Sequence, residues 1–217
     1  MARRPGGYTR LDVDERRRRL LDLGRSLFTS HPYDELSMAA IAREAGISKA
    51  LLYHYFPSKQ AYFVATLQEA AAQLAERVRP DADRPPGEQL SQALDAWLGW
   101  VEENRDGYAK LLRGATGAPE VRELVDRVRD DTAALIVARL WGDADADGDG
   151  DADGDGAAPP EIRAAVRGWL WFMDGACLDW VQHRDLDRGQ MHDLLLGTLP
   201  GAVAAAGHPE ILGRLGV

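Results

Sequence analysis

Hydrophobic residues recur at the spacing of an α-helix along most of this chain, and no stretch shows the alternation that is typical of a strand. The pattern predicts a helix over residues 14–30, then two short helices, then a long helix over residues 58–79. Further helical patterns cover residues 90–101, 106–113, 121–140, 160–183 and 191–203. The sequence therefore predicts an all-α protein with about nine helices.

Two of these patterns have features of their own. The pattern at 160–183 is apolar on nearly every side, which predicts a helix buried on most of its faces. The last helix contains Pro200 followed by Gly201, which predicts a kink or an interruption there.

Two breaks in the pattern indicate how the chain is divided. The segment PDADRPP, residues 80–86, ends the first group of helices, so we expect one domain over residues 1–79 and a helical body over residues 80–217. Within the body, residues 143–156 read DADADGDGDADGDG, a composition typical of a disordered acidic linker. When this segment is aligned with a calcium-binding EF-hand loop, glycine stands where the bidentate glutamate should be, so we expect no calcium site.

The most informative stretch is SMAAIAREAGISKALLYHYFPSK, residues 37–59. Ser37 and Ser48 are each placed to cap a short helix, and Gly46 lies where a chain leaving a helix often needs positive φ. Two short helices joined in this way form a helix-turn-helix, whose second helix enters the DNA major groove. The alternative is an ordinary helical hairpin with a polar outer face, but an exposed Tyr-His-Tyr run has no packing reason to exist.

The outward side of the second helix carries side chains that suit contact with DNA. Placing Leu52 and Phe56 inward leaves the opposite side free. Lys49 can reach a base edge or a phosphate, and Ala50 or Leu51 can touch a thymine methyl group. We therefore expect this helix to read base sequence.

The charge distribution supports the same interpretation. The net charge of −9 at first argues against nucleic acid, but residues 1–79 carry 13 Lys and Arg against 9 Asp and Glu. The rest of the chain carries 13 against 26, and seven of those acids lie in residues 143–156. A basic domain on an acidic body is typical of an electrostatically steered DNA-binding protein.

The segment AGISKALLYHYFPSKQAYF closely resembles the recognition-helix signature of the TetR family of bacterial transcriptional regulators. The resemblance is specific over residues 16–74 and only general beyond residue 78. It implies an all-α fold with a three-helix DNA-binding head and a helical ligand-binding and dimerisation body. A helical wheel places Tyr55 nearer the core than the resemblance does. The resemblance implies that Ser37, Tyr53 and Lys59 contact phosphates. The full set of candidate DNA-binding residues is Ser37, Lys49, Ala50, Leu51, Tyr53, His54, Tyr55 and Lys59.

All six tryptophans lie outside the head. Taken with the family resemblance, they indicate an aromatic-lined pocket for a small apolar or flat effector. Plain packing of the core is the alternative, and the sequence leaves both open. The candidate pocket residues are Trp97, Trp100, Tyr108, Leu111, Trp141, Trp169, Phe172 and Met173.

The last two helices resemble the dimerisation element of the same family, in which two helices from each protomer form a four-helix bundle. Gly168 and Gly175 are seven residues apart, so they share a face on which two backbones can approach closely. A two-fold dimer is also what a helix-turn-helix needs to read a palindrome. The candidate interface residues are Gly168, Gly175, Leu195 and Leu199.

Signals for catalysis, metals and membranes are weak or missing. Asp179 and His183 are placed to pair along a helix, but Cys177 faces elsewhere, and several Cys or His at metal-ligand spacing do not occur. We expect no enzyme, no cofactor and no metal. No apolar run reaches the length of a membrane span, the first residues lack the apolar core of a signal peptide, and a single cysteine fits a reducing compartment. We expect a cytoplasmic protein.

The leading hypothesis is a homodimeric, ligand-responsive transcriptional regulator that binds a palindromic operator in double-stranded DNA. Members of the family are most often repressors. We therefore expect a repressor that a small apolar or aromatic effector releases from DNA. The alternative is a helix-turn-helix regulator that protein partners control and that takes no small-molecule ligand.

Overall fold

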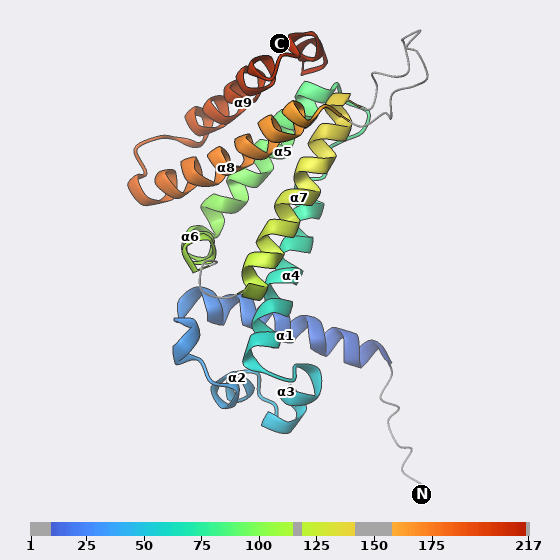
Figure 1. Cartoon of the computed structure of the whole chain (residues 1–217). Helices are drawn as coiled ribbons and strands as arrows, with labels where there is room; N and C mark the ends of the chain where they lie inside the picture. The colour runs from blue at the N-terminus through green and yellow to red at the C-terminus, as the bar shows by residue number, and fades with distance from the viewer. Residues whose placement is uncertain (1–9, 115–118, 142–157, 216–217) are drawn as a thin grey trace, which may run out of the picture. The chain divides into compact units, whose positions relative to one another are not determined.

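The computed structural model describes residues 10–114, 119–141 and 158–215, and within these ranges the chain forms nine α-helices, two 3-10 helices and no strand (Figure 1). The prediction of an all-α fold is confirmed. The predicted linker at 143–156 lies outside the described residues. The helices are α1 (Arg10–Ser30), η1 (Tyr33–Glu35), α2 (Met38–Glu44), α3 (Lys49–Tyr55), α4 (Lys59–Arg77), α5 (Pro86–Glu103), α6 (Arg105–Gly114), α7 (Pro119–Trp141), α8 (Pro160–His183), α9 (Arg188–Ala205) and η3 (Pro209–Leu215).

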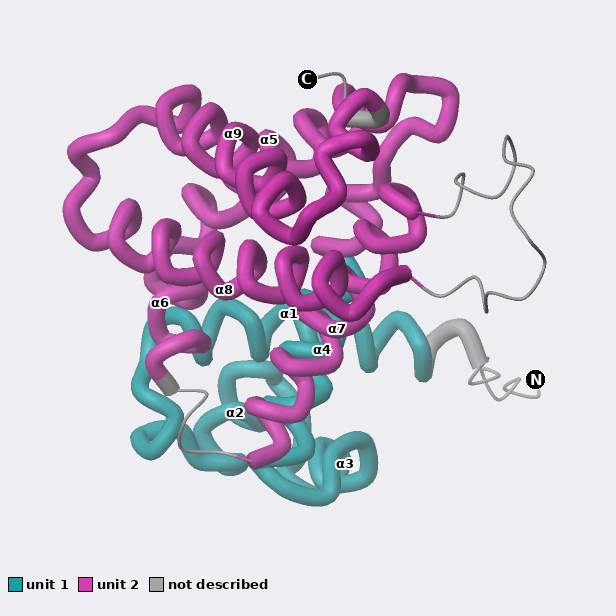
Figure 2. Tube along the Cα trace, turned by 45° about the horizontal axis from the view of Figure 1, so that its top comes forward, with its two compact units in different colours: residues 1–73 teal, residues 74–217 magenta. Residues whose placement is uncertain are grey.

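The chain divides into two compact units, residues 1–73 and residues 74–217, which Figure 2 shows in different colours. The boundary falls inside α4. The sequence prediction placed it just after that helix, at residue 79.

The first unit has a small apolar core that α1, α2, α3 and the beginning of α4 enclose. Its fully buried members include Ile41, Leu52 and Tyr62. The Tyr62 hydroxyl donates a hydrogen bond to the backbone carbonyl of Leu20 on α1. Burial raises the pKa of Tyr62 well above its ordinary value, so the hydroxyl keeps the proton that it donates. This bond ties α4 to α1 inside the core.

The face that α4 buries is not the one that its apolar spacing marks. Helical spacing marks an apolar stripe through Phe63, Leu67, Ala71 and Leu74. Phe63 and Leu67 are only half-buried, however, whereas Tyr62 and Thr66 are buried. The Thr66 hydroxyl donates to the Tyr62 carbonyl at 2.8 Å, so the buried polar side chain is satisfied within its own helix.

α1 and α4 approach each other very closely at Gly24. A methyl group built at this glycine would lie 2.4 Å from Thr66 Oγ1 and 2.8 Å from the Tyr62 hydroxyl oxygen. Both of those atoms are already held by hydrogen bonds. Glycine at position 24 is therefore what allows the two helices to pack at this distance.

We expect Gly24→Ala to destabilise the first unit by roughly 1–3 kcal/mol, because the added methyl group overpacks a filled core. Urea unfolding followed by circular dichroism measures the loss. Ser26→Ala, at an exposed position of the same helix, is the control and should change the unfolding free energy by less than about 0.5 kcal/mol. Thr66→Ala removes the closest atom and should recover part of the loss; strict additivity of the two substitutions would contradict the packing account.

The second unit is a bundle in which α8 packs against α7 and α9, α5 packs against α9, and α6 packs against α8. α8 and α9 run antiparallel and are joined by a short turn (Figure 1). Arg184 ends α8 in the left-handed region, with φ 58°. Asp187 then caps α9, and its carboxylate accepts the Gln190 N–H at 2.8 Å while the Gln190 side chain accepts the Asp187 N–H at 2.9 Å.

Two sequence predictions for this unit need correction. Of the predicted kink or interruption at Pro200, the interruption is wrong, because α9 continues through this residue. α8 is not buried on most sides within one chain, because Trp171 is 59% exposed and Phe172 is 41% exposed. The core of the unit is lined by another side of α8, through Val166, Leu170 and Cys177.

Candidate nucleic-acid interface and body core

The helix-turn-helix has the local geometry that the sequence predicts. The Ser37 hydroxyl oxygen accepts the Ala40 N–H, and that of Ser48 accepts the Leu51 N–H, both at 3.1 Å. Gly46, with φ +65°, turns the chain between α2 and α3. Both predicted caps and the predicted turn glycine are therefore confirmed.

α3 divides into a buried side and an exposed side. Leu52 is fully buried, and Phe56, which follows the helix, is 2% exposed. Tyr53 is 41% exposed, and the Lys49 ammonium lies 5.7 Å from the centre of its ring. Ala50 and His54 are also exposed, and Leu51 is half-buried. The outer side of α3 thus presents one cation and one large aromatic ring next to each other.

The two remaining candidates near α3 have partners inside the protein. Tyr55 is half-buried and packs against the core of the first unit, as the helical wheel indicates. The Lys59 ammonium donates to the Tyr33 backbone carbonyl at 2.9 Å and lies 4.1 Å from the centre of the Tyr33 ring. Lys59 therefore holds the η1 turn as well as carrying a positive charge, a role that sequence reasoning missed.

Among the candidate pocket residues, three aromatic side chains come together. The Tyr108 ring meets Trp97 and Trp100 edge-on, with ring centres 5.9 and 6.3 Å apart. Tyr108 is buried and both tryptophans are half-buried. α5 and the short helix α6 thus form an aromatic cluster inside the body.

The other candidate pocket residues are dispersed. The Trp169 indole donates to the Leu195 carbonyl at 3.0 Å, which joins α8 to α9. The Trp141 ring meets the His208 ring edge-on, with ring centres 5.4 Å apart. Phe172 lies on the exposed side of α8. Leu111 and Met173 are half-buried.

A buried polar network joins the aromatic cluster to α7. The Tyr108 hydroxyl donates to Asp174 Oδ1 at 3.1 Å, and Arg129 donates to Asp174 Oδ2 from Nε at 2.8 Å and from Nη2 at 2.7 Å. The side chains of Arg129 and Asp174 are only 17% and 16% exposed. Burial and the carboxylate of Asp174 raise the pKa of Tyr108 far above its ordinary value. Its hydroxyl therefore stays protonated and acts as the donor.

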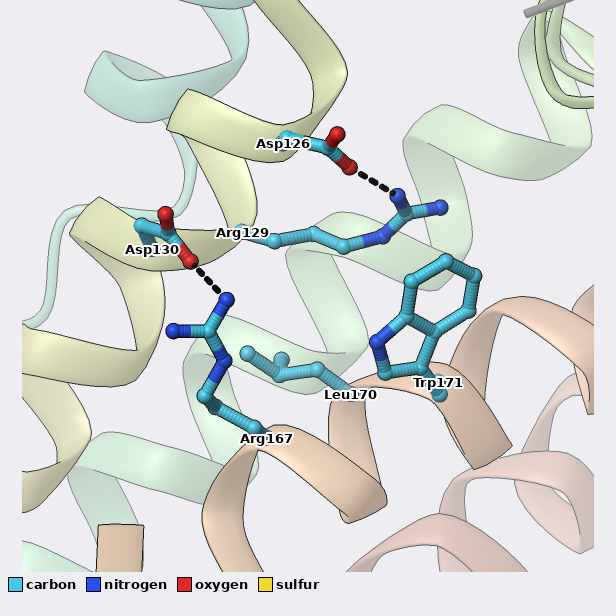
Figure 3. A pocket seen from close by; sticks show the side chains of 6 residues that line it. All are labelled: Asp126, Arg129, Asp130, Arg167, Leu170 and Trp171. Carbon is cyan, nitrogen blue, oxygen red and sulfur yellow. Dashed lines mark hydrogen bonds and ion pairs between the residues drawn. The ribbon is translucent and has the colours of Figure 1, made fainter. Parts of the chain in front are cut away.

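A small, charged pocket opens between α7 and α8, as Figure 3 shows. Its cavity volume is about 20 Å³, so it has room for little more than a water molecule. The Arg129 guanidinium lies 4.1 Å from the centre of the exposed Trp171 ring, and Arg167 pairs with Asp130 at 2.6 Å. The pocket contains none of the candidate effector-site residues; its lining residues are Asp126, Arg129, Asp130, Arg167, Leu170 and Trp171.

One side of α8 and one side of α9 are left uncovered within the chain. Methyl groups built at Gly168 and Gly175 on α8 meet nothing within 4 Å, and the same is true of Gly197 and Gly201 on α9. Leu194, also on this side, is 42% exposed. Sequence reasoning missed the α9 glycines, although their four-residue spacing was a usable signal. By contrast, the predicted interface residues Leu195 and Leu199 are fully buried in the chain's own core.

Two other reactive side chains considered for catalysis, His183 and Cys177, lie in the described part of the body. Asp179 and His183 pair, with His183 Nδ1 3.1 Å from Asp179 Oδ1, and both are exposed. Cys177 is fully buried, and burial together with Asp174 raises the pKa of its thiol far above the ordinary value. Within the described ranges, no three His, Cys, Asp or Glu side chains are grouped so as to hold a metal ion. None of the described helices has the length and apolar character that crossing a membrane requires.

Comparison with known proteins identifies the family. The family model described as "Bacterial regulatory proteins, tetR family" matches residues 20–66. A second model, "Tetracyclin repressor-like, C-terminal domain", matches residues 86–199, which is more than half of the chain. The chain belongs to the TetR family of bacterial regulatory proteins, as the recognition-helix signature indicates.

Individual relatives agree with this assignment. The chain is 33% identical over 116 residues to the transcriptional activator FasR of Mycolicibacterium smegmatis, a match that covers 51% of this chain and 53% of FasR. It is 28% identical over 133 residues to the transcriptional repressor KstR of Rhodococcus jostii, covering 61% of each. The chain thus spans only about half to three-fifths of the length of these curated relatives.

The fold is also found in solved structures. A crystal structure of a tetR-family transcriptional regulator from Streptomyces coelicolor matches with a TM-score of 0.75 and 29% identity, covering 93% of this chain and 87% of that chain. The family and these relatives are transcriptional regulators rather than enzymes, which agrees with the prediction that the chain is not an enzyme.

Proposed function

We propose that this protein is a dimeric transcriptional regulator, acting as a repressor, which binds a palindromic operator through α3 and leaves it when a small molecule binds the body. The exposed side of α3 carries the proposal, because a large aromatic ring and a lysine lie there without a packing role. The relatives named above include an activator, FasR, and a repressor, KstR, and the sign proposed here is the one expected from the family resemblance.

In this proposal the residues around α3 have two kinds of role. Lys49, Ala50 and Leu51 stand at the beginning of α3 and read base edges, with His54 beside them. Tyr53 packs its ring against sugars and offers its hydroxyl to a phosphate. The phosphate contacts that complete the set are Ser37, Tyr55 and Lys59.

The Ser37 assignment is compatible with its role as a helix cap. Its oxygen accepts the Ala40 N–H, which leaves the hydroxyl proton available for a phosphate oxygen. Lys59 uses one of its three N–H bonds on Tyr33, so two remain for DNA.

The dimer would form through the uncovered sides of α8 and α9. These two antiparallel helices present four glycines, so two copies can bring their backbones close together in a four-helix bundle. Trp171, Phe172 and Leu194 border the glycines and supply apolar area. We therefore keep Gly168 and Gly175 as interface residues and place Leu194, rather than Leu195 or Leu199, beside them.

The effector would bind at the aromatic cluster of Trp97, Trp100 and Tyr108. Indole and phenol rings that meet edge-on provide apolar walls for a flat or apolar molecule, and Asp174 lies behind the phenol. Trp169 and Trp141 have structural partners and are less suited to contact a ligand.

Selecting binding sites for the full chain from a random DNA pool tests the proposal. We expect a palindrome whose half-sites are about one helical turn or slightly more apart, with an affinity that falls steeply as salt rises. Failure to enrich any palindrome would contradict dimeric operator binding.

The selected operator then allows the effector to be tested. Aromatic and apolar compounds are screened for release of the protein from this DNA, with Trp100→Ala as the matched pocket variant. Release by at least one compound, weakened in the variant, is expected. If no compound releases the protein while a purified protein partner does, the partner-controlled alternative is correct.

A further inference from the structure

The Tyr108–Asp174–Arg129 network ends at the surface on Trp171. Tyr108 lies on α6, Asp174 and Trp171 lie on α8, and Arg129 lies on α7. Asp174 takes both nitrogen donors of Arg129 on one oxygen and the Tyr108 hydroxyl on the other. The same guanidinium lies next to the Trp171 ring (Figure 3), 4.1 Å from its centre, so a continuous line of contacts runs from the core to the surface.

Trp171 stands on the glycine side of α8. It lies three residues after Gly168 and four before Gly175, so helical periodicity puts all three on one side. It is also the most exposed large hydrophobic side chain that the structure describes, at 59%. A tryptophan at this position would contact any molecule that packs over Gly168 and Gly175.

We propose that Tyr108, Asp174 and Arg129 are positioning residues that hold Trp171 for contact with a second copy of this chain, and that subunit association thereby responds to what occupies the aromatic cluster. The proposal rests on the α8–α9 dimer proposed above. The occupant is a second copy because the glycines and Trp171 belong to the same surface of the two helices.

The network is built so that its two ends depend on each other. Asp174 holds the Arg129 guanidinium from α8, whereas Asp126, which accepts from Arg129 at 3.1 Å, lies on the same helix as Arg129. Asp174 in turn accepts the Tyr108 hydroxyl on Oδ1, and its side chain is only 16% exposed, so loss of that donor removes a hydrogen bond from a largely buried carboxylate. A molecule that moves the Tyr108 ring would therefore change the support of Trp171 without touching it.

A double-mutant cycle on dimer dissociation, measured by sedimentation at a series of concentrations, tests the proposal. Trp171→Leu keeps an apolar side chain but removes the face on which Arg129 stacks, and should weaken association about tenfold. Tyr108→Phe removes only the buried hydroxyl and should weaken association about three- to tenfold. The central expectation is that Tyr108→Phe has no further effect when Trp171→Leu is already present.

Controls separate this role from a merely structural one. If Tyr108→Phe does not fold, Arg129→Lys replaces it in the cycle. Arg129→Lys keeps the positive charge but alters the part of the network that contacts Trp171. It should weaken association, with no further effect when Trp171→Leu is already present. Arg167→Gln breaks the neighbouring exposed pair with Asp130 and should change association less than twofold. Melting curves check that each variant is folded.

Two outcomes separate failure of this inference from failure of the dimer. A wild-type monomer at micromolar concentration would remove the dimer and the inference with it. A wild-type dimer in which Trp171→Leu changes nothing, or in which Tyr108→Phe costs the same in both backgrounds, would overturn the network's role alone.

Discussion

Gly175→Leu should convert the proposed dimer to a monomer and remove its proposed binding to a palindromic operator. Within one chain the new side chain begins in open space, because a methyl group built at Gly175 has no neighbour within 4 Å. In the proposed dimer it meets the partner's backbone, and two-fold symmetry places the substitution in the interface twice. Overpacking by about 1–3 kcal/mol at each copy raises the dissociation constant by at least about 30-fold. Sedimentation and gel-shift titration measure both losses.

Stability of the single chain provides the contrast. Leucine is a better helix former than glycine by roughly 0.8 kcal/mol, so the folded monomer should not be weakened. Arg163→Leu, at an exposed position on a different side of α8, is the matched control and should leave association unchanged. A Gly175→Leu protein that remains a dimer of wild-type affinity would show that the glycine side of α8 is not the interface.

Lys49→Ala and Lys59→Ala should weaken DNA binding in two different ways. Lys49 is proposed to read a base, so its loss should change which operator bases are preferred, at a cost of about 1–3 kcal/mol for a lost contact. Lys59 is proposed to hold a phosphate, so its loss should weaken all DNA sites alike and lower the salt slope by about one unit. Site selection from a random pool, repeated with each variant at several salt concentrations, distinguishes the two.

The contact of Lys59 with Tyr33 adds an expectation of its own. Lys59→Ala removes a 2.9 Å hydrogen bond to a backbone carbonyl, so it should also lower the stability of the first unit by about 1 kcal/mol. Lys59→Arg keeps a cation and should preserve the salt slope. Equal shifts in base preference for Lys49→Ala and Lys59→Ala would show that the division into reading and positioning residues is wrong.

The features that were predictable from sequence are those that depend on neighbours in the chain. One or two turns of helix are enough to place such features. Examples are a serine at the start of a helix, a glycine in a left-handed turn, and an inward leucine four residues before an inward phenylalanine. The caps at Ser37 and Ser48, the φ of Gly46 and the burial of Leu52 and Phe56 therefore followed from local pattern alone.

Features that depend on contacts between distant segments were not predictable in this way. α9 contains the consecutive leucines Leu194, Leu195 and Leu196, and spacing cannot say which of them faces the core. The choice is made by α5 and α8, which pack on the side of Leu195. For the same reason the burial of Thr66 against Gly24 was invisible, since a polar residue and a glycine carry no apolar signal.

The burial of Cys177 would make the proposed dimer open to direct measurement. It is the only cysteine in the chain, and its buried thiol with a raised pKa resists alkylating reagents under mild conditions. A cysteine placed at an exposed site of the first unit, such as Glu44→Cys, would then be the one thiol that takes a spin label or a fluorophore. Each dimer would carry two labels without any change to its core. The distance between them, followed while an effector is added, would report directly how far the two DNA-reading units separate.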